Sequence, residues 1–380
     1  MKTVPYSHQY ITDDDVRGVV RALRSDWLTQ GPKIREFEEA LAEYTGARYA
    51  VAVSSGTSAL HLSMLALNVT EGDRVITSPI TFSASANCAL YVNARPSFVD
   101  IDDKTYHMDT ERLKDFLKVP SQRRKVKAVV PVHFMGTVAD IVEIKKVCAG
   151  YGIKVVEDAA HALGAEYRIR ERWAKVGSSR HSDITIFSFH PIKHITTGEG
   201  GAILTNDRNI YKSALKLRHH GIVKKEKGFW SYDIPQIGFN YRITDFQSAL
   251  GISQLKKLNK MVRERRRLVS TYNNRLSKIE AIRLPSERDD TRASYHLYVI
   301  RVPRKRRDRL YNYLKEKGIS TQVNYIPVHL LSYYKKTFGY RWNDFPVAER
   351  YFKECLSLPL YAGLSKPDQL KVIKGIEEFF

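Results

Sequence analysis

Short apolar runs alternate with stretches of helical spacing along much of this chain. Runs of this length between polar residues are typical of buried strands. Those that predict strands cover residues 50–53, 74–77, 96–99, 128–132, 155–157, 184–187 and 202–205. Because strands that alternate with helices favour a mostly parallel sheet covered on both faces, the pattern predicts an α/β fold. Ligands of such folds bind at the carboxyl ends of the strands.

Longer stretches predict helices. In the first of them, Val16, Val20 and Leu23 share one face, and Thr12 and Asp15 have the spacing of a capping box. The helices predicted in this part of the chain cover residues 13–27, 32–44 and 243–276. The chain after them predicts strands at 296–302 and 320–325 and helices at 345–356 and 367–379. We therefore expect a large domain over residues 1–245 and a small α+β domain over 246–380.

Composition narrows the class of protein. The chain has 380 residues, of which 43% are hydrophobic and 27% are charged, as in ordinary soluble globular proteins. Its first residues form no signal peptide, and no apolar run approaches the roughly 20 residues that span a bilayer. The three cysteines, Cys88, Cys148 and Cys355, are far apart and form no close pair. These features predict a cytoplasmic protein with reduced thiols and no membrane partner.

The formal net charge of +21 raises the possibility of a nucleic-acid partner. Two of the basic runs, however, are interrupted by Glu264 and Asp308 and fall in stretches that favour helices, so we interpret them as solvated helix faces. No zinc-finger, KH or RRM signature is present. His219 and His220 have no further ligands at sensible spacing, so no metal is expected. A positive field also suits a nucleotide diphosphate-sugar.

The stretch from Ser188 to Gly201 places Lys193 in a loop between two apolar strands. Hydroxyl residues flank the lysine, and a Gly-rich exit follows it. Desolvation lowers the pKa of a lysine and frees its neutral amine to attack a carbonyl. The loop therefore predicts a lysine that forms a Schiff base rather than a surface charge.

Two further segments indicate the cofactor. Asp158 ends an apolar strand, where a carboxylate can keep the ring nitrogen of pyridoxal phosphate protonated. Residues 51–62 read as a strand, a turn at Gly56 and a helix, and the N-terminus of a helix binds anions. The hydroxyls of Ser55, Thr57 and Ser58 can add donors to a phosphate there.

From about residue 6 to its C-terminus, the chain resembles the DegT/DnrJ/StrS family of sugar aminotransferases, which are fold-type I enzymes dependent on pyridoxal 5′-phosphate. The lysine loop is most similar to the subgroup that makes UDP-4-amino-4,6-dideoxy-N-acetyl-β-L-altrosamine in pseudaminic acid biosynthesis. The matching segments are 28–32, 55–60, 81–82, 157–160, 188–201 and 238–245.

The resemblance implies roles for particular residues. Lys193 would carry the cofactor, Asp158 would hold the ring nitrogen, Phe82 would stack on the ring and His161 would contact the ring hydroxyl. For Phe82 and His161, ordinary core positions remain alternatives. Asn240 and Arg242 would reach a phosphate across a dimer interface, or their segment would only lead into a helix capped by Thr244 or Asp245. The remaining implied contacts are Gly56, Thr57, Ser58 and Ser188 to the phosphate, and Tyr6, Thr29 and His329 to the substrate.

The resemblance also implies an activity. The expected enzyme is a homodimer with shared active sites that moves an amino group from glutamate to C4 of a UDP-linked 4-keto-6-deoxy-N-acetylhexosamine, with pyridoxamine phosphate as the intermediate form of the cofactor. A dTDP- or GDP-linked keto sugar is an alternative substrate. Relatives that carry histidine in place of the lysine dehydrate the sugar at C3, so Lys193 favours transamination over dehydration. A non-catalytic regulator is the remaining alternative.

Overall fold

A seven-stranded sheet forms the centre of the molecule, which the computed structural model describes over residues 3–225 and 230–380. Strand β9 is antiparallel to both of its neighbours, and all other neighbouring strands are parallel. The order across the sheet is β1 (Tyr49–Val53), β9 (Gly201–Thr205), β8 (Ile184–Ser188), β5 (Lys154–Asp158), β4 (Val126–Val130), β2 (Arg74–Thr77) and β3 (Arg95–Phe98). Each strand coincides with a predicted apolar run to within two residues.

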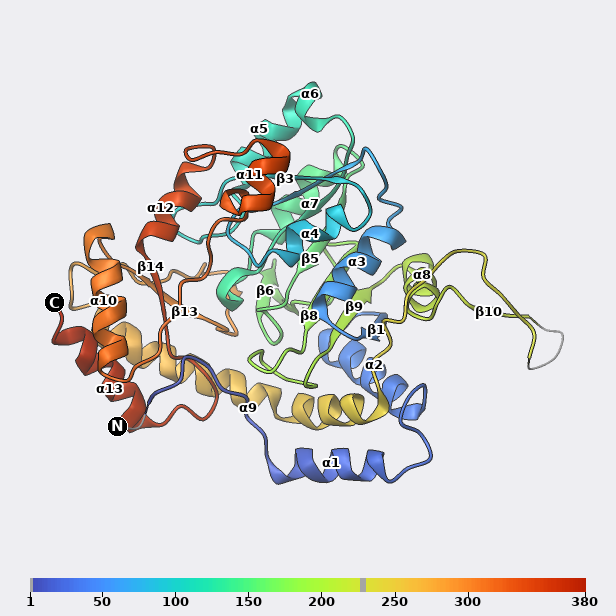
Figure 1. Cartoon of the computed structure of the whole chain (residues 1–380), viewed down its shortest axis with the longest axis horizontal. Helices are drawn as coiled ribbons and strands as arrows, with labels where there is room; N and C mark the ends of the chain where they lie inside the picture. The colour runs from blue at the N-terminus through green and yellow to red at the C-terminus, as the bar shows by residue number, and fades with distance from the viewer. Residues whose placement is uncertain (1–2, 226–229) are drawn as a thin grey trace.

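Helices cover both faces of this sheet (Figure 1). Alternate residues of a strand point to opposite faces, so Ala50 and Ala52 belong to one core and Val51 and Val53 to the other. The first core lies under α2 (Pro32–Thr45), α5 (Thr110–Lys118), α7 (Ile141–Ala149) and α9 (Asp245–Leu276), and the second under α3 (Gly56–Ala66), α4 (Ala84–Leu90) and α8 (Arg208–Arg218). Burial on both faces explains why the strands read as unbroken apolar runs.

Helix α1 (Asp13–Leu23) lies against the outer side of α9 (Figure 1). The predicted capping box between Thr12 and Asp15 is present. The side chain of Asp15 is also paired with Lys257 of α9 and accepts from Gln254, so a polar face of α1 turns inward. The predicted apolar face points outward instead, and Val16 and Leu23 are about half exposed.

A third core lies beyond the sheet and contains the second half of α9. It also takes in Val4 near the N-terminus, which pairs with Ile319. Because α9 contributes to this core and to the first one, it belongs to both parts of the chain, and the division at residues 245 and 246 stays a proposal. The other elements of this core are β13 (Tyr298–Arg301), α10 (Arg304–Glu316), β14 (Cys355–Leu358) and α13 (Lys366–Glu377).

Two predictions for the C-terminal part were wrong in detail. The helix predicted at 345–356 ends earlier, as α12 (Pro346–Glu354), because the chain then enters β14 and pairs with β13. The strand predicted at 320–325 does not form, and only Gln322 pairs there, with Ser357. The long charged helix and the final helix are confirmed as α9 and α13.

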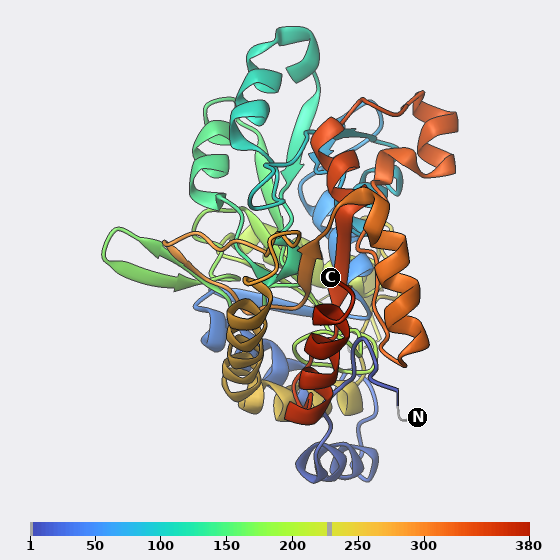
Figure 2. The same ribbon diagram turned by 90° about the vertical axis from the view of Figure 1, so that its left-hand side faces the viewer.

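The remaining elements are short. The hairpin of β6 (Glu166–Ile169) and β7 (Arg172–Lys175) pairs with β12 (Thr291–Arg292) and projects from the body (Figure 2). The ribbon of β10 (Val223–Lys224) and β11 (Tyr232–Asp233) projects on the right of Figure 1. No described helix is long and apolar enough to cross a membrane. The others are α6 (Pro120–Arg123), α11 (Ser332–Phe338) and the 3-10 turns η1 (Phe134–Gly136) and η2 (Val328–Leu330).

Candidate active site

A cavity of about 520 Å³ lies where β5 and β8 end and α3 begins. This is the edge of the sheet at which the sequence predicts ligand binding. The segments that form its wall come from distant parts of the chain, including residues 55–60, 81–84, 158–161, 186–199 and 322–325. Among the predicted site residues, those that line it are Tyr6, Gly56, Thr57, Phe82, Asp158, His161, Ser188 and Lys193.

The loop after β8 folds back on itself and presents Lys193 to the cavity. Its ends are held together because Phe189 donates its N–H to Gly200 and accepts from the N–H of Thr197. A Cβ at Gly200 would lie 2.1 Å from Oγ1 of Thr197, so only glycine permits this close return. Burial lowers the pKa of Lys193 to about 8, against an opposing influence of Asp158. About a tenth of its amine is therefore neutral at pH 7, and about half at pH 8.

Asp158 and Glu157 end β5 and face different surroundings. Asp158 lines the cavity, whereas Glu157 is buried beneath it and bonds to His133 at 2.7 Å. Because Nδ1 of His133 accepts from the N–H of Ala139, its Nε2 is the nitrogen that donates to Glu157. Burial acts to raise the pKa of Glu157, but these hydrogen bonds outweigh it and hold the pKa below its ordinary value. Glu157 thus braces the strand end that presents Asp158.

The N-terminus of α3 forms a cradle beside the end of β8. Ser55 caps the helix by accepting from the N–H of Ser58, which leaves the N–H groups of Gly56 and Thr57 at the cavity wall. A Cβ at Gly56 would lie 2.9 Å from Cβ of Ser188, so glycine lets the two elements approach. Free amides, a helix dipole and a serine hydroxyl suit a phosphate group.

Aromatic and imidazole rings form another wall of the cavity. Phe82 is 59% exposed, so it is not a core residue in this chain. Nε2 of His161 lies 3.4 Å from the hydroxyl of Tyr325, and burial lowers the pKa of His161 well below its usual value. Tyr6 donates from its hydroxyl to Oδ1 of Asn324 at 2.9 Å. No role was predicted for Tyr325 from the sequence, although it lines the cavity.

Five predicted residues do not line this cavity. Ser58 is buried behind it and bonds to Ser55. His329 is buried against Glu349, with Nε2 at 3.1 Å from a carboxylate oxygen. Thr29 is exposed and pairs with Thr244. The other two are Asn240, which is exposed and bridges to His219, and Arg242, whose Nη1 lies 2.9 Å from Nδ1 of His219.

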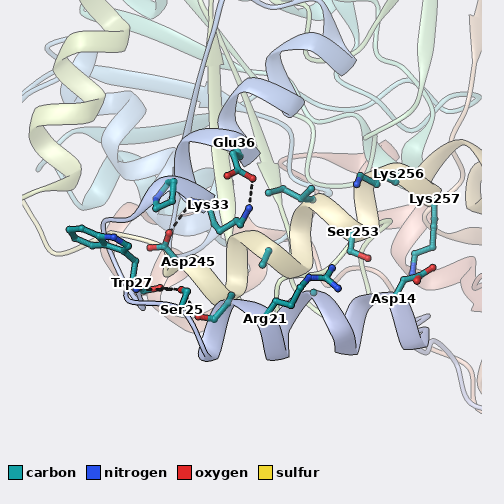
Figure 3. Close-up of a pocket in the computed structure, with 15 residues that line it drawn as sticks. Asp14, Arg21, Ser25, Trp27, Lys33, Glu36, Asp245, Ser253, Lys256 and Lys257 are labelled. Atoms are coloured by element: carbon teal, nitrogen blue, oxygen red, sulfur yellow. Dashed lines mark hydrogen bonds and ion pairs between the residues drawn. The ribbon is translucent and has the colours of Figure 1, made fainter.

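Thr29 pairs with Thr244, so two of the matching segments meet there, next to Asp245, which Figure 3 labels. Asp245 accepts from the N–H of Gly31 at 2.8 Å and from the N–H of Lys33 at 3.0 Å, so it caps α2 while Thr244 caps α9. The adjoining cavity of about 610 Å³ lies between α1, α2 and α9, away from the lysine loop. Its wall is largely charged, and Figure 3 labels Arg21, Lys33, Lys256 and Lys257 beside Asp14, Glu36 and Asp245, together with Trp27 and two serines.

A cofactor cavity of this composition on this sheet defines a fold-type I pyridoxal phosphate enzyme. Lysine, carboxylate, aromatic ring and phosphate cradle surround one space, and the close approach of Gly56 to Ser188 makes room for a phosphate. No three His, Cys, Asp or Glu side chains within residues 3–225 and 230–380 are arranged to hold a metal ion.

The chain belongs to the DegT/DnrJ/EryC1/StrS aminotransferase family, whose sequence profile matches residues 9–377. It is 38% identical over 386 residues to the spore coat polysaccharide biosynthesis protein SpsC of Bacillus subtilis. That alignment covers 99% of this chain and 96% of SpsC. It is 37% identical over 369 residues to the UDP-4-amino-4,6-dideoxy-N-acetyl-beta-L-altrosamine transaminase of Campylobacter jejuni. That alignment covers 96% of this chain and 94% of the transaminase.

Solved structures agree with this membership. Helicobacter pylori PseC, an aminotransferase in the biosynthesis of pseudoaminic acid, superposes with a TM-score of 0.91 at 31% identity, covering 100% of this chain and 99% of that one. The Streptococcus pneumoniae protein Spr1654, described as a sugar aminotransferase in its PMP form, superposes with a TM-score of 0.91 at 30% identity. The superposition covers 99% of this chain and 98% of that one. The fold prediction is confirmed, and the cofactor of this aminotransferase is pyridoxal phosphate.

Proposed function

We propose that this enzyme transfers an amino group from glutamate to C4 of a UDP-linked 4-keto-6-deoxy-N-acetylhexosamine. The observation that carries the proposal is the buried amine of Lys193 at the cavity wall, in a loop that matches the altrosamine transaminase subgroup. The similarity to the Campylobacter jejuni transaminase and to PseC supports the same substrate class. The net charge of +21 favours the approach of a diphosphate ligand.

The proposed roles follow from the chemistry of each side chain. When bound, pyridoxal phosphate supplies an aldehyde that accepts amines and a protonated ring that withdraws electrons. Nζ of Lys193 holds the cofactor and then moves a proton to and from the reacting carbon, because its lowered pKa of about 8 lets both the neutral and the charged amine be populated near that pH. Asp158 holds the proton on the ring nitrogen, and Phe82 and His161 orient the ring. Gly56, Thr57 and Ser188 hold the phosphate, and Tyr6 contacts the substrate. Ser58, Thr29 and His329 do not line the cavity of their own chain, so the phosphate role of Ser58 and the substrate roles of Thr29 and His329 rest on the family resemblance alone.

The proposal includes a homodimer. The apolar face of α1 is uncovered, and it continues through Trp27 and Leu28, each more than half exposed. Ile237, at 82% exposed, precedes the segment of Asn240 and Arg242. Large apolar side chains exposed in such numbers mark interaction surfaces. A second copy of the chain is the occupant we propose for them.

The composition of the cavity supports a contribution from that second copy. None of the described residues that line it is an arginine, and its basic members are His161, His190 and Lys193. Carboxylates and diphosphates are bound most strongly by charge-assisted donors, above all by arginine. Arg242 is half-buried at the surface near Asn240 and does not reach the cavity of its own chain. We therefore propose that Asn240 and Arg242 complete the site of the partner subunit.

The test is turnover of a panel of UDP- and dTDP-linked 4-keto-6-deoxy sugars, with and without an N-acetyl group, with glutamate as donor. We expect the UDP-linked N-acetyl sugar to gain one amine at C4 and its analogues to react poorly, because buried polar partners would be left unpaired. Mass spectrometry that shows loss of water at C3 without a gained amine contradicts transamination. Faster turnover of dTDP-sugars without the N-acetyl group leaves the family assignment standing and overturns the proposed substrate.

A further inference from the structure

Ser85 lies behind the cofactor cavity and touches the carboxylate that faces it. It sits on the first turn of α4, its side chain is fully buried, and its Oγ donates to Oδ2 of Asp158 at 2.6 Å. The other carboxylate oxygen, Oδ1, accepts from the N–H of Ala160 at 3.1 Å. Within the described part of the chain, Asp158 therefore has one donor on each of its oxygens, and Ser85 supplies the side-chain donor.

The proton of Ser85 has a defined direction. Its Oγ lies 2.7 Å from Oγ1 of Thr81 and 3.3 Å from the carbonyl oxygen of Phe82. An ionised carboxylate can only accept a hydrogen bond, and the contact with Asp158 is the shortest of the three contacts of Ser85. The Ser85 proton therefore points at Asp158. Thr81 must then donate to Ser85. Two buried hydroxyls thus form a chain, from Thr81 through Ser85 to Asp158, in which each bond polarises the next.

We propose that Ser85 is a positioning residue that fixes the orientation of Asp158 toward the ring nitrogen of the bound cofactor. A hydrogen bond donated to a carboxylate stabilises its charged form. The shared proton then stays on the ring, which keeps the ring electron-withdrawing. The inference rests on the proposed role of Asp158, and it does not depend on the identity of the sugar.

The surroundings of Asp158 make this donor important. Cys88, one turn further along α4, is fully buried, and burial together with the charge of Asp158 raises the pKa of its thiol to about 12. Tyr325 is likewise held neutral by burial and by Asp158. Asp158 also interacts electrostatically with Lys193, which, unlike Cys88 and Tyr325, can carry positive charge and is the reacting amine. The hydroxyl of Ser85 therefore stabilises the carboxylate whichever protonation state Lys193 adopts.

The experiment compares Ser85→Ala with a matched control, Ser63→Ala. Ser63 is also a fully buried serine on a helix, but its Oγ donates to the carbonyl oxygen of Ala59. The first readout is the 15N chemical shift of the ring nitrogen in holoenzyme loaded with 15N-labelled cofactor, measured without substrate. The second is the rate of the half-reaction with the amino donor, separated into kcat and KM.

In Ser85→Ala we expect the 15N signal to move toward that of an unprotonated pyridine. We expect kcat of the donor half-reaction to fall about 10- to 100-fold, with little change in KM, because one charge-assisted hydrogen bond is lost. Ser63→Ala should match the wild type in both readouts. Thr81→Val should move both readouts in the same direction by less, since it removes only the outer donor.

A wild-type 15N shift in Ser85→Ala, at any level of activity, overturns the proposal. If Ser85→Ala does not fold, Ser85→Cys retains the volume with a weaker donor, and Thr81→Val leaves Ser85 in place; unchanged 15N shifts in both overturn it equally. An error in the proposed sugar substrate would affect only the half-reaction with the keto sugar. Both readouts are taken before that half-reaction, so the two failures can be told apart.

Discussion

Nη1 of Arg301 lies 2.7 Å from Oδ1 of Asp103, and this ion pair joins the loop after β3 to strand β13. Two further arginines hold the same carboxylate, Arg283 at 2.6 Å and Arg350 at 3.1 Å. If the chain divides at residues 245 and 246, as we propose, one carboxylate of the large domain is bound by three arginines of the small domain. This cluster would then fix the two parts relative to each other.

This contact predicts a dependence of stability on pH. Partial burial acts to raise the pKa of Asp103, but the hydrogen bonds from Arg283 and Arg301 outweigh it and hold the pKa far below its usual range. Because the folded pKa lies below the unfolded one, the stabilisation is present above about pH 4 and is lost as the pH falls further. Asp103→Asn should cost roughly 1 kcal/mol at pH 7, since the carboxyl is partly exposed and screened.

Urea unfolding at pH 7 and at pH 3 measures this effect. The difference between wild type and Asp103→Asn should shrink at the lower pH. Asp115→Asn is the control, because Asp115 is 75% exposed and pairs only with Lys118 one turn away. A pH-independent difference for Asp103→Asn would show that packing rather than charge is responsible.

A second prediction concerns the cofactor lysine. Borohydride reduction of the holoenzyme followed by peptide mapping should place the adduct on Lys193, and Lys193→Ala should lose the adduct. The control is Lys256→Ala, in the second cavity between α1, α2 and α9, which should retain the adduct. Because burial lowers the pKa of Lys193 to about 8, capture of the cofactor by apoenzyme should speed up as the pH rises and level off above about 8. An adduct on another lysine, or a rate still rising steeply at pH 10, contradicts this assignment.

The wall of the cavity allows a third prediction. Phe82 is exposed to the cavity, with its ring centroid 6.2 Å from that of Tyr325, so it can stack on a bound ring. Phe82→Ala should raise the dissociation constant of the cofactor about tenfold, measured by fluorescence titration of the Lys193→Ala protein, and Phe82→Tyr should restore it. If Phe82→Ala binds the cofactor as tightly as the parent protein does, Phe82 does not stack on the cofactor ring.

The sequence predicted the site better than the C-terminal fold. Gly56, Asp158 and Lys193 follow local strand-turn patterns, so their positions at one sheet edge follow from a parallel topology. The strand at Cys355–Leu358 was missed because it forms only through long-range pairing with β13. The contact between His329 and Glu349 could not be predicted for the same reason, since the two residues meet only in the folded chain. Ser85 was not singled out, because its contacts with Thr81, which precedes α4, and with Asp158 also form only in the folded chain.

The last prediction tests the shared site. Lys193→Ala removes the amine from the cavity of its own chain, whereas Asn240→Ala alters a segment that lies outside that cavity. Each homodimer should be inactive, but a heterodimer contains one site with both residues intact, so mixed and re-annealed chains should recover up to about a quarter of wild-type activity. Mixing Lys193→Ala with Asp158→Ala is the control, because both residues line the cavity of one chain, so each cavity of the heterodimer carries one of the two changes and no activity should return. If Asn240 instead served its own chain, the test pair would stay as inactive as this control pair, and a chain with both Lys193→Ala and Asn240→Ala would leave one full site when paired with a wild-type chain. Absence of recovery in the test pair, with heterodimers demonstrated by native mass spectrometry, rules against the shared site.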